Sequence, residues 1–270
     1  MRINRLLVVT VLLIIQFIGY SCKTVPVSGR RQVAFLPESM LVDMSLTSYN
    51  DFLASHRLSV NTEQTAMIKS VGDRISSAVE DYLREHGLES RIKDFHWEFN
   101  LIEEDVANAW AMPGGKIVFY SGILPITKTE AGVAVVMGHE IAHVVARHGN
   151  ERMSQQLLVQ TGGLALSVAM KERPEETRNM FLAAYGVGSA VGVILPYSRA
   201  HEKEADRLGL IFMAMAGYDP GEAVSFWERM EQISGGAGPP EFLSTHPSSA
   251  TRIRDMKSFL PEAMKYYRAH

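Results

Sequence analysis

The stretch VVMGHEIAHVVARHG, Val135–Gly149, is an apolar run interrupted by three histidines and one glutamate. Histidine and glutamate are costly to bury unless something pairs with them. On a helix, residues four apart lie one turn apart on the same face, so His139 and His143 project together. Two imidazoles at that spacing suit a zinc ion, and Glu140 can reach a water held on the metal. The alternative, two core histidines satisfied by backbone groups, would leave this carboxylate on the same apolar helix without a metal.

Catalytic zinc usually takes three protein ligands and leaves one position for water, so a third ligand is expected. The best candidate lies in SRAHEKEADRLGL, Ser198–Leu210, where Glu202 and Asp206 are four apart on a predicted helix. Glu202 is the predicted third ligand, and Asp206 is predicted to hydrogen-bond a liganding histidine. Three other side chains compete for the third position: His148, His201 and Glu204. Helical spacing disfavours the first and the last of these, but it does not exclude His201.

The segment before the histidine helix predicts one long helix and a small sheet. Apolar residues recur in steps of three and four between Asn61 and Gly87, which indicates an amphipathic helix capped near Asn61 and ended by Gly87. FHWEFNLI, Phe95–Ile102, alternates apolar and polar residues and predicts a strand. NAWAMPGGKIVFYSGIL, Asn108–Leu124, predicts a hairpin with Pro113-Gly114-Gly115 at its turn.

From Lys128 onward the periodicity is helical, with breaks expected at Gly149, near Pro174, at Pro196, around Gly217 and in GGAGPP, residues 235–240. Two stretches in this part carry no charge, Gln156–Met170 and Met180–Leu195. Both fall short of the roughly 18–20 apolar residues of a membrane span. We therefore expect buried or membrane-leaning helices in preference to spans. Three glycines in the second stretch would allow close helix packing.

The composition is that of an ordinary globular protein, with 270 residues, 46% hydrophobic and 21% charged, and a formal net charge of −3. No long basic block occurs, which argues against nucleic acid as a partner. The predicted organisation is a signal segment at residues 1–22, a linker with a first helix at 23–60, and one domain at 61–270.

The first 22 residues have the layout of an export signal, with Arg2 and Arg5 before an apolar core from Leu6 to Ile18. The only cysteine of the chain, Cys22, closes this segment, so an internal disulfide is excluded. The pattern resembles a bacterial lipoprotein signal, which is cut before a cysteine that then carries lipid. An uncleaved anchor, or a signal in which the cysteine is incidental, is the alternative. Either main interpretation puts the remaining chain outside the cytoplasm.

Four stretches together resemble one metallopeptidase family: NAWAMPGGKIVFYSGIL, MGHEIAHVVARHGNER, LPYSRAHEKEADRLGL and STHPSSATRI. They are similar to the gluzincin metallopeptidases of the CAAX-prenyl-protease and HtpX superfamily, and most to its soluble or lipid-anchored BepA, LoiP and Oma type. The stretch TVPVSGRRQ after Cys22 looks like the mature start of such lipoproteins. The chain stops at His270 without tetratricopeptide repeats, so the resemblance does not imply partner recognition through them.

The resemblance implies an α+β fold: a mostly helical, zincin-like domain with a small antiparallel sheet whose edge strand flanks the active-site helix. We expect Lys116–Tyr120 or its neighbour to provide that edge. The resemblance also implies one zinc ion per chain, held by His139, His143 and Glu202, with Glu140 catalytic and Asp206 in support. The resemblance also implies a role near the metal for His246 and Arg252. Sequence spacing alone assigns neither residue such a role.

The expected activity is that of a zinc metalloendopeptidase acting on unfolded or misassembled envelope proteins, and outer-membrane proteins are the substrates favoured by resemblance. Glu140 would take a proton from a zinc-held water as that water attacks a peptide carbonyl. His246 or Arg252 would steady the oxyanion, or His246 would fill the open zinc position and hold the enzyme idle. Lipid on Cys22 would anchor the protein, most simply at the outer membrane facing the periplasm.

Two other function classes stay open at this point. One is a chaperone-like lipoprotein with a structural zinc, which would have no need of Glu140. The other is a membrane-embedded prenyl-protein protease, which would need several spanning helices that the sequence does not show.

Overall fold

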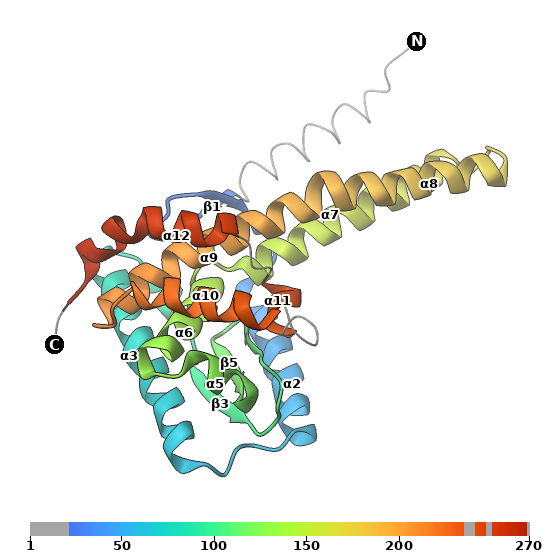
Figure 1. The fold of residues 1–270 in the computed structure, drawn as a ribbon. Helices are drawn as coiled ribbons and strands as arrows, with labels where there is room; N and C mark the ends of the chain where they lie inside the picture. Colours follow the sequence, from blue (N-terminus) through green and yellow to red (C-terminus); the bar gives the residue numbers. More distant parts are fainter. Residues whose placement is uncertain (1–21, 235–240, 247–249, 269–270) are drawn as a thin grey trace. The chain divides into compact units, whose positions relative to one another are not determined.

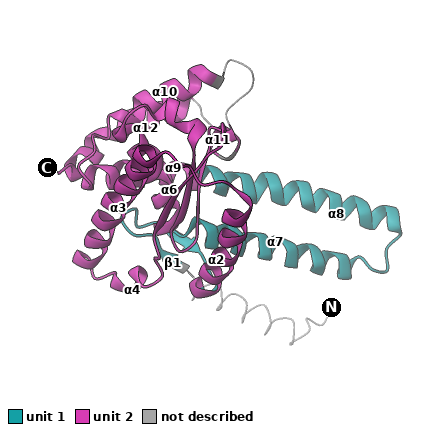
Figure 2. Cartoon of the chain, turned by 90° about the horizontal axis from the view of Figure 1, so that it is seen from below, with its two compact units in different colours: residues 1–37, 147–200 teal, residues 38–146, 201–270 magenta. Residues whose placement is uncertain are grey.

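The structure is a computed structural model that describes residues 22–234, 241–246 and 250–268. Contacts between residues divide the chain into two compact units, coloured separately in Figure 2. Unit 1 consists of residues 1–37 and 147–200, and unit 2 consists of residues 38–146 and 201–270. The predicted signal segment lies outside the described residues except for Cys22, and so does the GGAGPP stretch.

Unit 2 holds a three-stranded sheet and most of the helices, and its elements are α2 (Glu38–Ser55), α3 (Thr62–Glu85), α4 (Glu89–Ile92), β3 (Glu98–Ile102), β4 (Ala109–Met112), β5 (Lys116–Tyr120), η1 (Ser121–Ile123), α5 (Leu124–Thr127), α6 (Glu130–Val145), α10 (Glu222–Ser234), α11 (Glu241–Thr245), α12 (Ala250–Ala263) and η3 (Met264–Tyr266). Helix α9 (Leu195–Met215) starts in unit 1 and continues into unit 2. The fold class is confirmed, since helices dominate and the sheets are small.

The long helix predicted before the sheet is α3. The side chain of Asn61 accepts a hydrogen bond from the backbone N–H of Gln64, which caps the first turn as expected. The helix ends before Gly87, whose φ of +69° suits a residue without a Cβ. Its periodic apolar residues are all completely buried, and these are Ile68, Val71, Ile75, Val79 and Leu83. Helix α3 packs on β3 and α6, while α2 packs on β4 and β5 (Figure 1).

The predicted hairpin is confirmed, but the sheet is mixed instead of purely antiparallel. The strand order is β3-β5-β4, with β5 parallel to β3 and antiparallel to β4. Gly114 and Gly115 adopt φ values of +87° and +89° in the turn. A Cβ on Gly115 would clash with the Trp97 ring, so glycine is required there. Strand β5 is therefore central, and the edge that faces the histidine helix belongs to its neighbour β4, which packs on α6.

Unit 1 consists of a two-stranded ribbon and a pair of long helices, and its elements are β1 (Cys22–Thr24), β2 (Arg31–Val33), α7 (His148–Ala169), α8 (Glu175–Ser189), the π-helix η2 (Ala190–Ile194) and the first turn of α9. The expected break near Pro174 is present between α7 and α8. The break expected at Pro196 is wrong, because the chain stays helical from α8 through η2 into α9. The wider π turn just before Pro196 offers room for a ring that would clash in a regular helix.

Candidate metal centre

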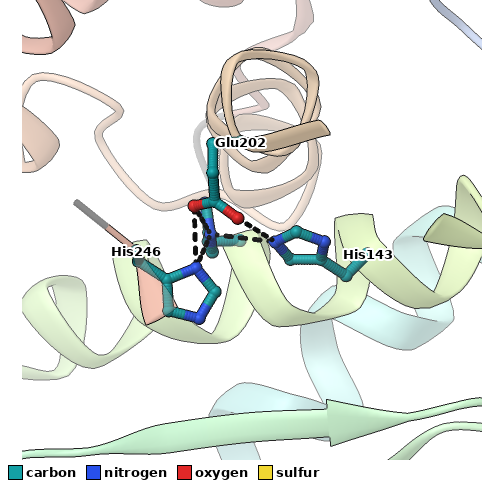
Figure 3. Close-up of side chains that lie close together, drawn as sticks. His143, Glu202 and His246 are labelled. Atoms are coloured by element: carbon teal, nitrogen blue, oxygen red, sulfur yellow. Dashed lines mark hydrogen bonds and ion pairs between the residues drawn. The ribbon is translucent and has the colours of Figure 1, made fainter. Parts of the chain in front are cut away.

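Four side chains from three segments of unit 2 meet at one point. Helix α6 supplies His139 and His143, α9 supplies Glu202, and His246 follows α11. One ligand atom from each lies within 4.8 Å of all the others. Figure 3 shows the Glu202 carboxylate directed between the rings of His143 and His246.

The separations between these atoms fit a tetrahedral cation site. The His139 Nε2 atom lies 3.1 Å from His143 Nε2 and 3.0 Å from His246 Nδ1. The Glu202 oxygens lie 3.4 Å from the Nε2 atoms of His139 and His143, and one of them lies 2.7 Å from His246 Nδ1. Zinc–ligand bonds of about 2.0–2.1 Å place the ligand atoms of a tetrahedron roughly 3.3 Å apart. Three imidazoles and one carboxylate are also ordinary zinc ligands, so the residues fit the metal.

The carboxylate of Asp206 orients His139. Its Oδ1 lies 3.0 Å from His139 Nδ1, so the ring donates there and turns the Nε2 lone pair toward the other ligands. Burial alone would lower the pKa of His139, but hydrogen bonds to Asp206 and Glu202 outweigh it and raise that pKa to about 9. The surroundings of this imidazole therefore favour positive charge, as a cation site requires.

The Arg252 side chain is held by Asp206, His246 and Trp227 beside the candidate metal centre. It donates two hydrogen bonds to Asp206, a third to the backbone oxygen of His246, and its guanidinium lies 3.7 Å above the Trp227 ring. Burial would raise the pKa of Asp206, but the Arg252 charge and the bond to His139 hold it below its usual range. The alternative role as an oxyanion donor is therefore less well supported for Arg252 than a positioning role.

Glu140 is the exception in this network. It is 2% exposed, and its Oε1 atom has no hydrogen-bond partner among the described residues. The His246 Nε2 atom lies 3.5 Å from that oxygen, within ion-pair distance. Burial raises the pKa of Glu140, which gives this carboxylate a greater affinity for a proton than an exposed glutamate has. Buried polar atoms are normally hydrogen-bonded, and a water molecule that donates to this oxygen would supply the missing hydrogen bond.

Two glycines let the ligand-bearing helices approach each other. A Cβ on Gly138 would lie 2.8 Å from the Gly209 backbone oxygen, and a Cβ on Gly209 would lie 2.9 Å from the His139 nitrogen. Both are closer than real Cβ contacts allow. Close contact between α6 and α9 therefore depends on glycine at both positions, and that contact brings Glu202 to the histidines.

The structure brings together most residues predicted for the site. None of the alternative third ligands belongs to the group of four ligand atoms. Sequence reasoning missed the two glycines and two aromatic residues, Trp227 and Phe242. The Phe242 ring lies 4.6 Å from the His246 ring and backs it. The glycines stand inside the motifs quoted for the resemblance and were a readable signal, whereas neither aromatic residue carried one.

Comparison with known proteins gives one family and several relatives. The model of peptidase family M48 matches residues 71–260. The mitochondrial metalloendopeptidase OMA1 of Schizosaccharomyces pombe is 39% identical over 175 residues, which are 64% of this chain and 50% of the relative. The protein of the same name from Saccharomyces cerevisiae is 30% identical over 250 residues, 90% of this chain and 70% of the relative.

A bacterial relative is the beta-barrel assembly-enhancing protease of Escherichia coli, 32% identical over 169 residues, 61% of this chain and 34% of that protein. The chain spans about half the length of the Schizosaccharomyces relative and a smaller part of the bacterial one. These matches confirm the resemblance that the four sequence stretches indicated.

Proposed function

Because the chain belongs to peptidase family M48, we propose that it is a zinc metalloendopeptidase that cleaves unfolded or misassembled proteins of the cell envelope. The observation that carries the proposal is the buried Oε1 atom of Glu140, which has no hydrogen-bond partner among the described residues and lies near the four ligand atoms. A chaperone-like protein with a structural zinc would have no use for a buried, unpaired carboxylate at that place.

His139, His143 and Glu202 would hold the zinc, and the ion would supply a Lewis acid that polarises the peptide carbonyl and acidifies water. Glu140 takes the proton of the attacking water on its unpaired oxygen and delivers it to the leaving nitrogen. The raised pKa of this carboxylate suits both transfers. Asp206 keeps the His139 ring in one orientation during the reaction, and Arg252 keeps Asp206 ionised.

His246 has two possible tasks that its position supports. Its Nδ1 atom points at Glu202 and His139, so it can act as a fourth ligand in a resting enzyme. Its Nε2 atom faces Glu140, so a displaced ring could instead donate to the oxyanion. We favour the resting role, because Nδ1 lies among the ligand atoms.

The substrate would bind as an extra strand on β4. No other strand pairs with the outer edge of β4 among the described residues, whereas backbone bonds to residues 57–59 cover part of β3. Strand addition recognises mostly the backbone of an extended peptide. A preference for unfolded chains over particular sequences is the expected consequence.

The envelope location draws on the signal-like start and on a relative. The name of the Escherichia coli relative describes a protease that enhances beta-barrel assembly, which favours outer-membrane proteins as substrates here. We propose that lipid on Cys22 anchors the chain at the outer membrane, facing the periplasm. Mass spectrometry of the mature N-terminus tests this, and an unmodified Cys22 or an uncleaved start would contradict the anchor.

Metal removal tests the activity. Chelation should abolish cleavage of an unfolded protein such as casein, and one equivalent of zinc should restore it. The Glu202→Ala variant should bind much less zinc than the wild type. The Lys203→Ala variant, changed at the neighbouring exposed position, should bind the normal amount. Full zinc occupancy in Glu202→Ala would remove Glu202 from the ligands and promote His201. Zinc binding without any cleavage product would favour the chaperone-like alternative.

A further inference from the structure

The helical pair of unit 1 has two uncharged segments joined by a charged tip. Two stretches contain no Asp, Glu, Lys or Arg: residues 153–170, in α7 and its C-cap Met170, and residues 179–198, in α8, η2 and α9. At 1.5 Å per residue they are about 27 Å and 30 Å long, close to the roughly 30 Å hydrocarbon core of a bilayer. Six of the eight residues between them, 171–178, are charged.

The side chains of this pair are exposed on all sides except where the two helices touch. Large apolar side chains between 46% and 67% exposed are Leu164, Val168, Met180, Phe181, Val187 and Val191. Among the described residues, the stretch 175–215 is the one helix long and apolar enough to cross a membrane, and none of its most apolar part is buried. A helix lying flat on a membrane would need a charged face, and residues 179–198 have none.

Three hydroxyl groups within the uncharged segments donate hydrogen bonds inside the pair, whereas the buried Gln155 Nε2 atom, near the start of the first segment, has no hydrogen-bond partner among the described residues. The Tyr185 hydroxyl donates across to the Val159 backbone oxygen at 2.9 Å. Hydroxyls of Thr161 and Ser189 donate back to carbonyls of their own helices. Gly162 and Gly163 make room for the Tyr185 ring, so this tyrosine fills the contact between the helices. Internal satisfaction of polar groups is what a hydrocarbon environment requires.

The N-terminal ribbon is bound at the start of the first uncharged segment. Arg30 donates two hydrogen bonds to the buried Glu151 carboxylate, at 3.0 and 2.7 Å. The Phe35 backbone N–H donates to Ser154, one turn further along α7. Cys22 pairs with Val33 in the same ribbon. A lipid on Cys22 would therefore attach close to the end of α7 at which the uncharged stretch begins.

We propose that α7 and the continuous helix α8–η2–α9 insert into a lipid bilayer as a transmembrane hairpin, with the charged tip on the far side. The occupant of the exposed surface is lipid, because the uncharged lengths match the hydrocarbon thickness and charges stand at both ends. Helix α7 by itself does not reach the length and hydropathy of a crossing helix, so it inserts as the packed partner of the longer helix, with local thinning or Lys171 reaching the interface making up its length. Only the argument from Cys22 rests on the proposed lipid anchor.

This inference revises the sequence-based preference against spans. That preference rests on the shortness of both uncharged stretches, and the second is taken to end at Leu195, just before the break expected at Pro196. The helix instead continues past Pro196, and the uncharged helical length grows accordingly. A Cβ added at Gly186, Gly188 or Gly192 would meet nothing within 4 Å, so the close packing expected of these glycines occurs at Gly162 and Gly163 instead.

Site-specific quenching tests the hairpin in the full chain. Cys22→Ser removes the native thiol and the lipid, and one new cysteine then carries an environment-sensitive fluorophore at Leu164→Cys or Val187→Cys. Val60→Cys, 70% exposed in unit 2, is the matched control. After reconstitution into phosphatidylethanolamine–phosphatidylglycerol vesicles, doxyl groups at the bilayer centre should quench the two hairpin labels and iodide should not. The control should behave in the opposite way, and Glu140→Gln should leave every result unchanged.

Labelling of the charged tip, residues 171–178, distinguishes a hairpin that crosses the bilayer from one that enters and leaves on the same side. An impermeant thiol reagent added to intact vesicles reaches only the outer side. The fraction of Glu172→Cys that it labels should equal the fraction of Val60→Cys that it leaves unlabelled, because the two positions lie on opposite sides of the membrane. Equal outward labelling of both positions would contradict a span. Iodide quenching at Leu164 and Val187, or protection from both quenchers in a dimer, would contradict insertion. Because neither catalysis nor lipidation enters these measurements, their failure is separable from failure of the proposed function.

Discussion

Arg252 binds Asp206 through two parallel hydrogen bonds, from Nε to Oδ2 at 2.7 Å and from Nη2 to Oδ1 at 2.5 Å. Asp206 in turn lies 3.0 Å from His139 Nδ1. The Arg252 guanidinium thus fixes the orientation of the metal ligand His139 through Asp206. Its direct contact with that ring is weak, since Nη2 lies 3.5 Å from His139 Nδ1.

Removing this guanidinium should weaken metal binding. Arg252→Ala leaves the buried Asp206 carboxylate without its main partner, and loss of such supporting groups typically lowers metal affinity about 10–100-fold. Competition titration with a zinc chelator measures the change. Arg254→Ala, exposed on the same helix, is the control and should bind zinc as the wild type does. Equal affinities in the two variants would show that Arg252 does not position the site.

The contact between α6 and α9 should not tolerate a methyl group. Gly209→Ala places a Cβ against the His139 backbone, so the helices must separate at a cost of roughly 1–3 kcal/mol. Thermal unfolding and zinc content should both fall. Gly188→Ala adds the same methyl within a helix where nothing lies within 4 Å, so it should lower neither the unfolding temperature nor the zinc content. Normal zinc content in Gly209→Ala would mean that the close approach does not set the ligand geometry.

Replacing His246 distinguishes its two roles. If the ring mainly fills the open ligand position, His246→Ala should cleave an unfolded protein faster than the wild type, which is the result we expect. If it mainly stabilises the oxyanion, cleavage should fall by roughly 10²–10³-fold. An unchanged rate at unchanged zinc content would assign it neither role.

The stability of unit 2 should depend on pH through Tyr49. Burial raises the pKa of this 1% exposed tyrosine, to which Asn100 donates a hydrogen bond. Because the folded pKa lies above the unfolded value of about 10, the stabilisation is fully present below pH 10 and is lost as pH rises further. The stability difference between wild type and Tyr49→Phe should therefore shrink above pH 10 in urea unfolding. Tyr267→Phe, at an exposed position, is the control, and a constant Tyr49 difference would contradict the prediction.

Sequence pattern was sufficient to predict the features that depend on residues close together in the chain. The cap of α3, the turn at Gly114 and the one-turn spacing of His139 and His143 all follow from residues within a few positions of each other. Spacing also pointed to Glu202 and Asp206, because both lie on one helix. Convergence of that helix with α6 depends on the glycine contact, which no periodicity reveals.

Non-local features escaped sequence reasoning. The parallel pairing of β3 with β5 depends on how the chain crosses the sheet, which alternation of side chains does not encode. The position of His246 was implied only by resemblance, since 107 residues separate it from His139. The continuous helix through Pro196 was missed because a π turn can absorb the ring, and a proline in sequence predicts the opposite.

The most direct test of the central claim is the rate of casein cleavage by Glu140→Gln at a zinc content matched to the wild type by metal analysis. The substitution keeps the size of the side chain but removes its capacity to accept a proton. The account predicts unchanged folding and metal content with a rate lowered roughly 10²–10⁴-fold, while Glu231→Gln, exposed on α10, keeps full activity. Cleavage by Glu140→Gln at the wild-type rate would contradict the assignment of Glu140 and, with it, the proposed reaction.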